Sequence, residues 1–157
     1  MSPAFTDLTK KKIEEIVGRY PNKQAALLPV LHLAQSEFGQ IGAAEEALVA
    51  AALDIKPIEV HEVVTFYTMY NRTSVGTYHI QVCSNLSCSL LGSGKLIDHL
   101  SRKLGILPGE TTKDGRFTLS TVECLGACEE APSMMINFDY YGGLDEKKID
   151  KILDDLK

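Results

Sequence analysis

All four cysteines of this 157-residue chain fall into two tight pairs, and they are the side chains best suited to chemistry. Cys83 and Cys88 lie in VCSNLSCSLLG, whereas Cys124 and Cys128 lie in ECLGACEEAP. Four thiolates can bind zinc or an iron–sulfur cluster, and four thiols can also remain free or form disulfides. A dithiol redox pair is disfavoured, because the chain contains no Cys-x-x-Cys.

The spacing within the pairs favours a two-iron cluster over a single zinc ion. Zinc-binding loops place roughly two to four residues between paired cysteines, so Cys83 and Cys88 are at the wide end of that range. A pair separated by four residues also occurs in plant-type ferredoxins. A two-iron cluster is larger than one ion, and each iron needs its own pair of thiolates. Two pairs on two loops match that requirement, with zinc as the alternative.

The elements that would position these loops follow from the periodicity of apolar residues. The segment TYHIQVC alternates strictly between apolar and polar positions, which predicts a strand that ends at the first cysteine. The second half of the chain is therefore predicted to contain a strand over 77–83, a helix over about 92–104, strands over 116–124 and 133–141, a turn at YYGG, and a helix over about 145–156.

The order of these elements brings the two cysteine pairs together. A strand–helix–strand crossover makes the first two strands parallel, so their carboxyl ends lie at the same edge of the sheet. Cys83 and Cys124 each follow the end of one of these strands, and all four sulfurs are then expected to converge there. Near them, Ser84, Asn85, Ser87 and Ser89 supply polar groups, and Gly126 permits a close backbone approach.

The first half of the chain is predicted to be helical. Asn22 is expected to cap a helix over 23–38 that Gly39 ends, and Pro29 should kink this helix or mark a restart. Further helices are predicted over about 43–53 and from Pro57 onward. The polar segment NRTSVG then marks a boundary. The predicted organisation is a helical domain over 1–72 and a second domain over 73–157.

Composition restricts the kinds of partner and compartment. The net charge of −5 disfavours nucleic acid, which requires a basic surface. The longest apolar run, ALVAAAL, is far shorter than the roughly 20 residues that a membrane span needs, and the N-terminus shows no signal-peptide core. We therefore expect a location inside the cell, where thiols stay reduced and structural disulfides are disfavoured.

The cysteine loops resemble those of a known family. VCSNLSC and VECLGACEEAP, together with PIEVHEVVTFYTMY and INFDYYGGL, are similar to the 24-kDa subunit of respiratory complex I, called NuoE in bacteria. The resemblance extends over nearly the whole chain, without a departure at the ligand positions. It implies a helical bundle followed by a thioredoxin-like domain with a small mixed sheet flanked by helices. It also implies one [2Fe-2S] cluster bound by Cys83, Cys88, Cys124 and Cys128.

The same resemblance implies a partner and a role. The cluster would take one electron from FMN in a flavin subunit of the NuoF type, which oxidises NADH, so NAD and FMN are expected in the partner and not in this chain. The protein would lie in the cytoplasm, peripheral on the inner face of the membrane as part of the complex. Relatives serve in NAD-linked hydrogenases and formate dehydrogenases, and a homodimer of the isolated protein is left open.

Three further expectations follow from individual residues. Carboxylates around the second pair should oppose reduction of an anionic cluster and lower its potential. Pro132 precedes a predicted strand, as a cis-proline does in thioredoxin-like folds. GSGK, residues 92–95, lacks the spacing of a phosphate-binding loop and is interpreted as a helix N-terminus. The rival functions are a zinc-stabilised interaction module and a stand-alone ferredoxin.

Overall fold

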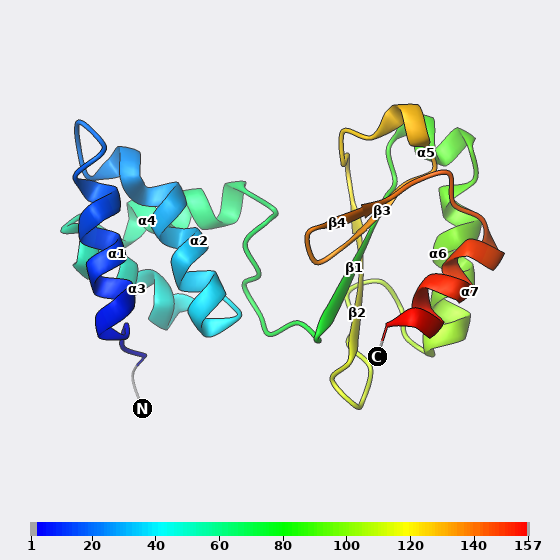
Figure 1. Ribbon diagram of the computed structural model, residues 1–157, viewed down its shortest axis with the longest axis horizontal. Helices are drawn as coiled ribbons and strands as arrows, with labels where there is room; N and C mark the ends of the chain where they lie inside the picture. Colours follow the sequence, from blue (N-terminus) through cyan, green and yellow to red (C-terminus); the bar gives the residue numbers. More distant parts are fainter. Residues whose placement is uncertain (1–2, 157) are drawn as a thin grey trace. The chain divides into compact units, whose positions relative to one another are not determined.

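The computed structural model describes residues 3–156, which form two compact units (Figure 1). The first unit ends at Ser74 and the second begins at Val75. The first is entirely helical, whereas the second combines a sheet with helices. No helix among the described residues has both the length and the apolar composition that crossing a bilayer requires.

The helical unit begins where a side chain caps the first helix. The Thr6 hydroxyl accepts a hydrogen bond from the Thr9 N–H at 3.3 Å, so one of the unpaired amides of the first turn is satisfied. Pro57 occupies the first turn of the fourth helix, where its missing N–H is tolerated. The helices are α1 (Asp7–Val17), α2 (Leu27–Phe38), α3 (Ala43–Leu53) and α4 (Pro57–Phe66), with a short 3-10 helix, Gln24–Ala26, before α2.

Pro29 marks a restart, as the sequence predicted. The Asn22 carboxamide oxygen accepts from the Ala25 N–H at 2.8 Å and opens the 3-10 turn. The α-helix then starts at Leu27, so Pro29 lies in its first turn, where its ring displaces no intrahelical hydrogen bond. Gly39 ends α2 in the left-handed region with φ 77°. The core of this unit includes Val30, Leu31, Val49, Leu53 and Val60, all fully buried.

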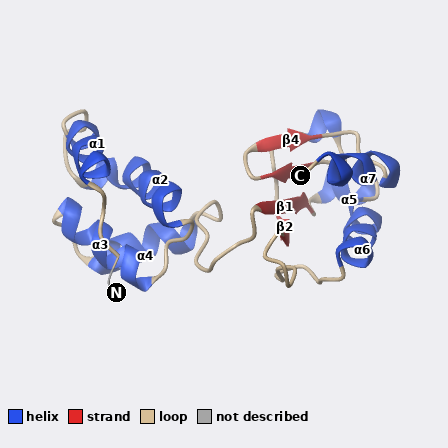
Figure 2. Ribbon diagram, turned by 60° about the horizontal axis from the view of Figure 1, so that its bottom comes forward, coloured by secondary structure: helices blue, strands red, loops and turns tan. Residues whose placement is uncertain are grey.

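The second unit contains a mixed sheet, as expected from the sequence, but with four strands instead of the three predicted. The strand order is β2-β1-β3-β4; β1 pairs parallel with β2 and antiparallel with β3, and β3 pairs antiparallel with β4. Figures 1 and 2 show α6 and α7 covering one face of this sheet. The elements are β1 (Tyr78–Cys83), α5 (Leu86–Leu90), α6 (Ser93–Leu104), β2 (Phe117–Val122), β3 (Met134–Ile136), β4 (Asp139–Tyr141) and α7 (Glu146–Asp155).

Apolar residues from the sheet and the two helices form one core. Ile80 of β1 and Leu119 of β2 are fully buried, as are Leu100 of α6 and Ile149 of α7. Each such side chain stabilises the fold by about 1.5–3 kcal/mol through burial. The parallel pair β1–β2 is therefore anchored in this core. The convergence of the cysteine loops depends on that pair.

Two local predictions for this unit were wrong. The segment 133–141 is not one strand but two, joined by a two-residue turn at Asn137 and Phe138 instead of a turn at YYGG. Asn137 makes this possible because it adopts a left-handed conformation, φ 55°, that asparagine tolerates. A short helix, α5, lies inside the first cysteine loop, where no helix was predicted.

Candidate metal centre

The parallel pairing of β1 and β2 brings the two cysteine loops to one edge of the sheet. Cys83 is the last residue of β1 and is aligned with Val122, the last residue of β2. The Ser84 N–H and hydroxyl both donate to the Val122 carbonyl, at 2.9 and 3.1 Å, and extend the pairing beyond the strands. Figure 1 shows the gold segment that follows β2 beside α5. The Cys83 sulfur lies 3.7 Å from the Glu123 carbonyl oxygen, directly before Cys124.

The first loop is folded back by a short capped helix. The Asn85 side chain caps α5 by accepting from the Leu86 N–H at 2.7 Å, and the Ser89 N–H donates to the Asn85 carbonyl at 2.8 Å. This turn carries Cys88 back against Cys83, and the two thiols are hydrogen-bonded to each other. Both side chains are buried, each with 2% of its surface exposed.

The second loop is more open. Cys124 and Cys128 are both exposed, and Cys128 begins a short 3-10 helix that runs to Glu130. The Gly126 N–H donates to the Cys124 sulfur at 3.3 Å, and Gly126 adopts φ 72°, which favours glycine. The Gly143 N–H donates to the Glu130 carbonyl at 2.6 Å and ties the end of this loop to the segment between β4 and α7.

The peptide bond before Pro132, whose isomer the sequence left open, is cis, and it leads into a residue that the sequence did not single out. After the cis Ala131–Pro132 bond, the Ser133 carbonyl accepts from the Cys83 N–H at 3.1 Å. The Ser133 hydroxyl oxygen lies 3.5 Å from the Cys88 sulfur, and the side chain is 1% exposed. A small polar residue before an apolar strand gives no signal of this contact, which arises only from the tertiary fold.

The two buried thiols have opposite pKa shifts. Burial raises the pKa of Cys83, and the adjacent Cys88 thiol adds to the rise, against backbone hydrogen bonds from Asn85 and Leu125. Burial also opposes ionisation of Cys88, but the hydroxyl and backbone of Ser133, together with the Cys83 thiol, outweigh it and lower the pKa of Cys88. The surroundings thus favour ionisation of Cys88 over that of Cys83, and the thiolate is the form that binds a metal.

The surface around the loops combines acidic and apolar side chains. Glu123, Glu129 and Glu130 of the second loop are exposed. On the first loop Leu86, Leu90 and Leu91 are exposed, beside the exposed polar residues Ser84, Asn85, Ser87 and Ser89. Exposed leucines grouped on one short segment are typical of a surface that contacts another protein.

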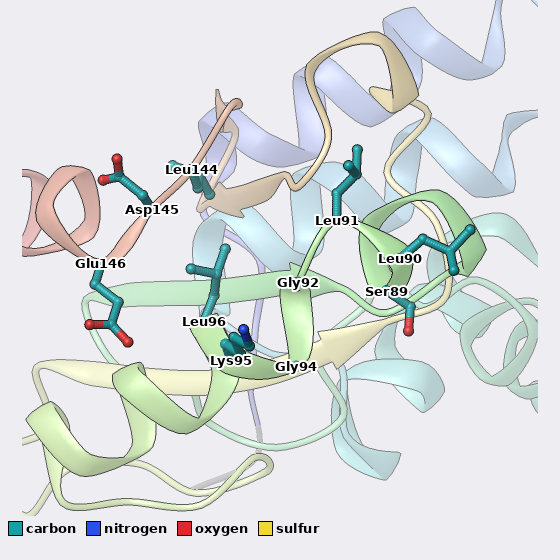
Figure 3. A pocket seen from close by; sticks show the side chains of 10 residues that line it. All are labelled: Ser89, Leu90, Leu91, Gly92, Gly94, Lys95, Leu96, Leu144, Asp145 and Glu146. Atoms are coloured by element: carbon teal, nitrogen blue, oxygen red, sulfur yellow. The ribbon is translucent and has the colours of Figure 1, made fainter.

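An open pocket of about 750 Å³ lies next to the first loop, but it contains no cysteine (Figure 3). Its lining includes Lys95 as well as Asp145 and Glu146, so its charges are mixed. GSGK forms the start of α6, with Gly92 as its N-terminal flanking residue, which agrees with the predicted helix N-terminus.

The donor set fits a two-iron cluster. All four cysteines are free thiols, from two loops at one sheet edge, and backbone N–H groups point at the sulfurs of Cys83 and Cys124. Within residues 3–156, no three His, Cys, Asp or Glu side chains gather closely enough to hold a single metal ion together. Two irons need two thiolates each at separate points, and thiolates with amide donors are the usual protein environment of such clusters.

Proteins of similar sequence and nearly equal length belong to NADH-quinone oxidoreductases. One such protein, from Rhizobium meliloti (strain 1021), is 45% identical over 148 residues, covering 94% of this chain and 88% of the relative. Another, from Rickettsia conorii (strain ATCC VR-613 / Malish 7), is 47% identical over 167 residues, covering 100% of this chain and 99% of the relative.

A solved structure has a similar fold. An NAD+-reducing [NiFe]-hydrogenase in the air-oxidised state matches with a TM-score of 0.71 and 28% identity over 83% of this chain. This chain spans only 22% of the hydrogenase chain that it matches. The sequence model of the thioredoxin-like [2Fe-2S] ferredoxin family matches residues 13–157, which include both cysteine loops and the whole sheet. The chain therefore belongs to the thioredoxin-like [2Fe-2S] ferredoxin family.

Proposed function

We propose that this chain is an electron-transfer subunit of an NADH-quinone oxidoreductase and that Cys83, Cys88, Cys124 and Cys128 hold one [2Fe-2S] cluster. The observation that carries the proposal is the meeting of two cysteine loops at the carboxyl ends of the parallel strands β1 and β2. Relatives of nearly equal length that are named as subunits of such a complex support it.

The two loops of the site differ in how far they would shield the cluster from solvent. A [2Fe-2S] centre accepts one electron at a time. The first loop shields one side of the site from water, because Cys83, at the end of β1, and Cys88, within α5, are both buried. The second loop leaves Cys124 and Cys128 open to the surface. An electron donor is therefore expected to approach from the side of the second loop.

The partner that fits this face is a protein carrying FMN and an NADH site. The exposed leucines of the first loop offer an apolar contact, and the carboxylates of the second loop suit a basic rim on the partner. On this proposal the present chain needs no nucleotide or flavin site of its own, and its place at the membrane is peripheral, through the complex.

Co-expression with an FMN- and NADH-binding subunit of the NuoF type tests the proposal. The pair should copurify, and NADH should bleach the visible absorbance of the cluster in the pair but not in this chain alone. The Cys88→Ser variant is the matched control, since the pair should then lack the cluster signal while the flavin is still reduced by NADH. A cluster that NADH leaves oxidised in the copurified pair would contradict the proposal.

The hydrogenase match supports a second candidate, a subunit of the NADH-reacting part of an NAD-linked hydrogenase. Both candidates use the same site, so the partner separates them. Copurification of the flavoprotein with nickel and with hydrogen-dependent NAD reduction would favour the hydrogenase. Copurification with quinone-dependent NADH oxidation would favour the first candidate.

A further inference from the structure

Ser133 is a buried polar residue held directly against a cysteine of the site. Its side chain is 1% exposed, and its hydroxyl oxygen lies 3.5 Å from the Cys88 sulfur. Its backbone also contributes a hydrogen bond to that sulfur. Two groups of one residue therefore act on the same sulfur, and this residue lies directly before β3, far from Cys88 in the sequence.

The position of Ser133 is fixed by the sheet, not by the cluster loops. Its carbonyl accepts from the Cys83 N–H at 3.1 Å, and the next residue, Met134, pairs with Val82 of β1. Met134 is fully buried in the core. The hydroxyl is consequently presented to Cys88 by a residue anchored to β1 and to the buried core.

Binding of a metal decides which atom of this contact is the donor. In the free thiol, either the sulfur or the hydroxyl can donate. A cysteine that ligates iron is a thiolate without a proton, so it can only accept. The Ser133 hydroxyl must then donate to the Cys88 sulfur, or a buried hydroxyl would lose its partner.

We infer that Ser133 is a positioning residue that raises the reduction potential of the cluster through its hydrogen bond to Cys88. This inference rests on the proposed function, because it requires the cluster. The reduced cluster carries one more negative charge than the oxidised cluster, so a donor to its sulfur stabilises the reduced form more strongly. The hydroxyl thereby offsets part of the effect of the acidic residues on the second loop.

The test is an EPR-monitored redox titration of the full chain after anaerobic reconstitution with iron and sulfide. In Ser133→Ala the ratio of reduced to oxidised cluster at a fixed potential should fall about tenfold, equivalent to a midpoint about 59 mV lower. The matched control is Ser120→Ala on β2, because the Ser120 hydroxyl lies 2.9 Å from the His79 ring nitrogen. In this control, the ratio of reduced to oxidised cluster at the same potential should stay within a factor of two of the wild-type ratio.

A second pair of variants separates the hydroxyl from packing. Ser133→Thr and Ser133→Val have nearly equal volumes, but only threonine keeps the donor, so the valine variant should have the lower midpoint. Equal midpoints in this pair, loss of iron in both, or an unchanged midpoint in a fully loaded Ser133→Ala chain would each overturn the inference. A wild-type chain that binds no iron would instead overturn the proposed function.

Discussion

The two cysteine loops occupy the same edge of one sheet, yet they differ in burial and support. The first loop has its own helix, α5, and both of its cysteines are buried and hydrogen-bonded to each other. The second loop has only a 3-10 turn, and both of its cysteines are exposed. The difference shows that the fold encloses the first pair of cysteines, whereas the second pair lies at the surface.

The two loops therefore differ in how well they protect their cysteines and in how easily a partner can reach them. A buried pair is protected from water and from oxidants, and an exposed pair gives a short route to a partner. On the proposed function, the first loop would retain the cluster and the second loop would face the electron donor.

The largest expected effect comes from removing one ligand on each side. Cys88→Ser should reduce bound iron from about two per chain to nearly none, because a buried hydroxyl is a poor ligand for iron and no other donor can enter. Cys128→Ser should retain part of the iron, since water or a thiol from solution can reach an exposed position. Iron analysis of both reconstituted variants checks this. Equal iron retention in the two would show that burial does not distinguish the loops.

A packing change directed at the second loop should have the next largest effect. An added Cβ at Gly142 would lie 2.9 Å from the Glu130 carbonyl oxygen and closer still to its side chain. Gly142→Ala should therefore displace this loop, destabilise the unit by about 1–3 kcal/mol and accelerate cluster loss. Urea unfolding and the decay of visible absorbance measure the two effects.

The control is Gly94→Ala in α6, where an added Cβ meets nothing within 4 Å. Alanine is favoured over glycine inside a helix by up to about 1 kcal/mol, so this variant should be slightly more stable. A destabilised Gly94→Ala chain, or a Gly142→Ala chain with unchanged cluster lifetime, would contradict the assignment of Gly142 to support of the second loop.

The acidic residues of the second loop should have a smaller influence. Glu129→Gln removes one negative charge near the site, so reduction should become easier by about twofold in the reduced-to-oxidised ratio at low salt. Because Glu129 is exposed, the difference should vanish near 1 M salt. Glu110→Gln, on the loop before β2, is the control and should leave the ratio unchanged. An effect of Glu129→Gln that persists at high salt would indicate a structural cause.

The smallest effect is expected far from the cysteines, between α6 and α7. Asp150 accepts from Lys103 and lies 2.8 Å from the His99 ring, and these two partners lower its pKa below 3.8. A lowered pKa stabilises the fold above pH 3.8, and this contribution is lost as the pH falls through the folded value. Asp150→Asn should therefore be less stable than the wild type at pH 7, and urea unfolding should show the difference shrinking below pH 3.8.

This last variant also tests whether the site is independent of the helix pair. Its cluster potential at pH 7 should match that of the wild type, because Asp150 contacts neither loop in the described structure. A shifted potential would mean that the packing of α6 against α7 controls the cysteine loops.

Much of the architecture was predictable because it depends on regular patterns. Alternation in TYHIQVC and the strand–helix–strand order correctly predicted the parallel pair β1–β2. Asn22, Pro29 and Gly39 each supplied a local signal for where a helix starts or ends. That the four cysteines are the cluster ligands stays a prediction, supported by the position of their loops.

The rest could not be predicted because it depends on short or long-range features. Residues 86–90 are too few to show a helical period, and Asn137 was overlooked as a turn residue because apolar residues surround it. The contact between Ser133 and Cys88 joins residues 45 positions apart and carries no local signature. The burial difference between the loops is likewise a property of the tertiary structure.

Metal analysis of the chain alone tests the central claim most directly. After anaerobic purification and reconstitution, we expect about two irons per chain, no stoichiometric zinc, visible absorbance, and an EPR signal that appears only on one-electron reduction. One tightly bound zinc per chain, without colour or a redox signal, would contradict the claim that these two loops form an electron-transfer site.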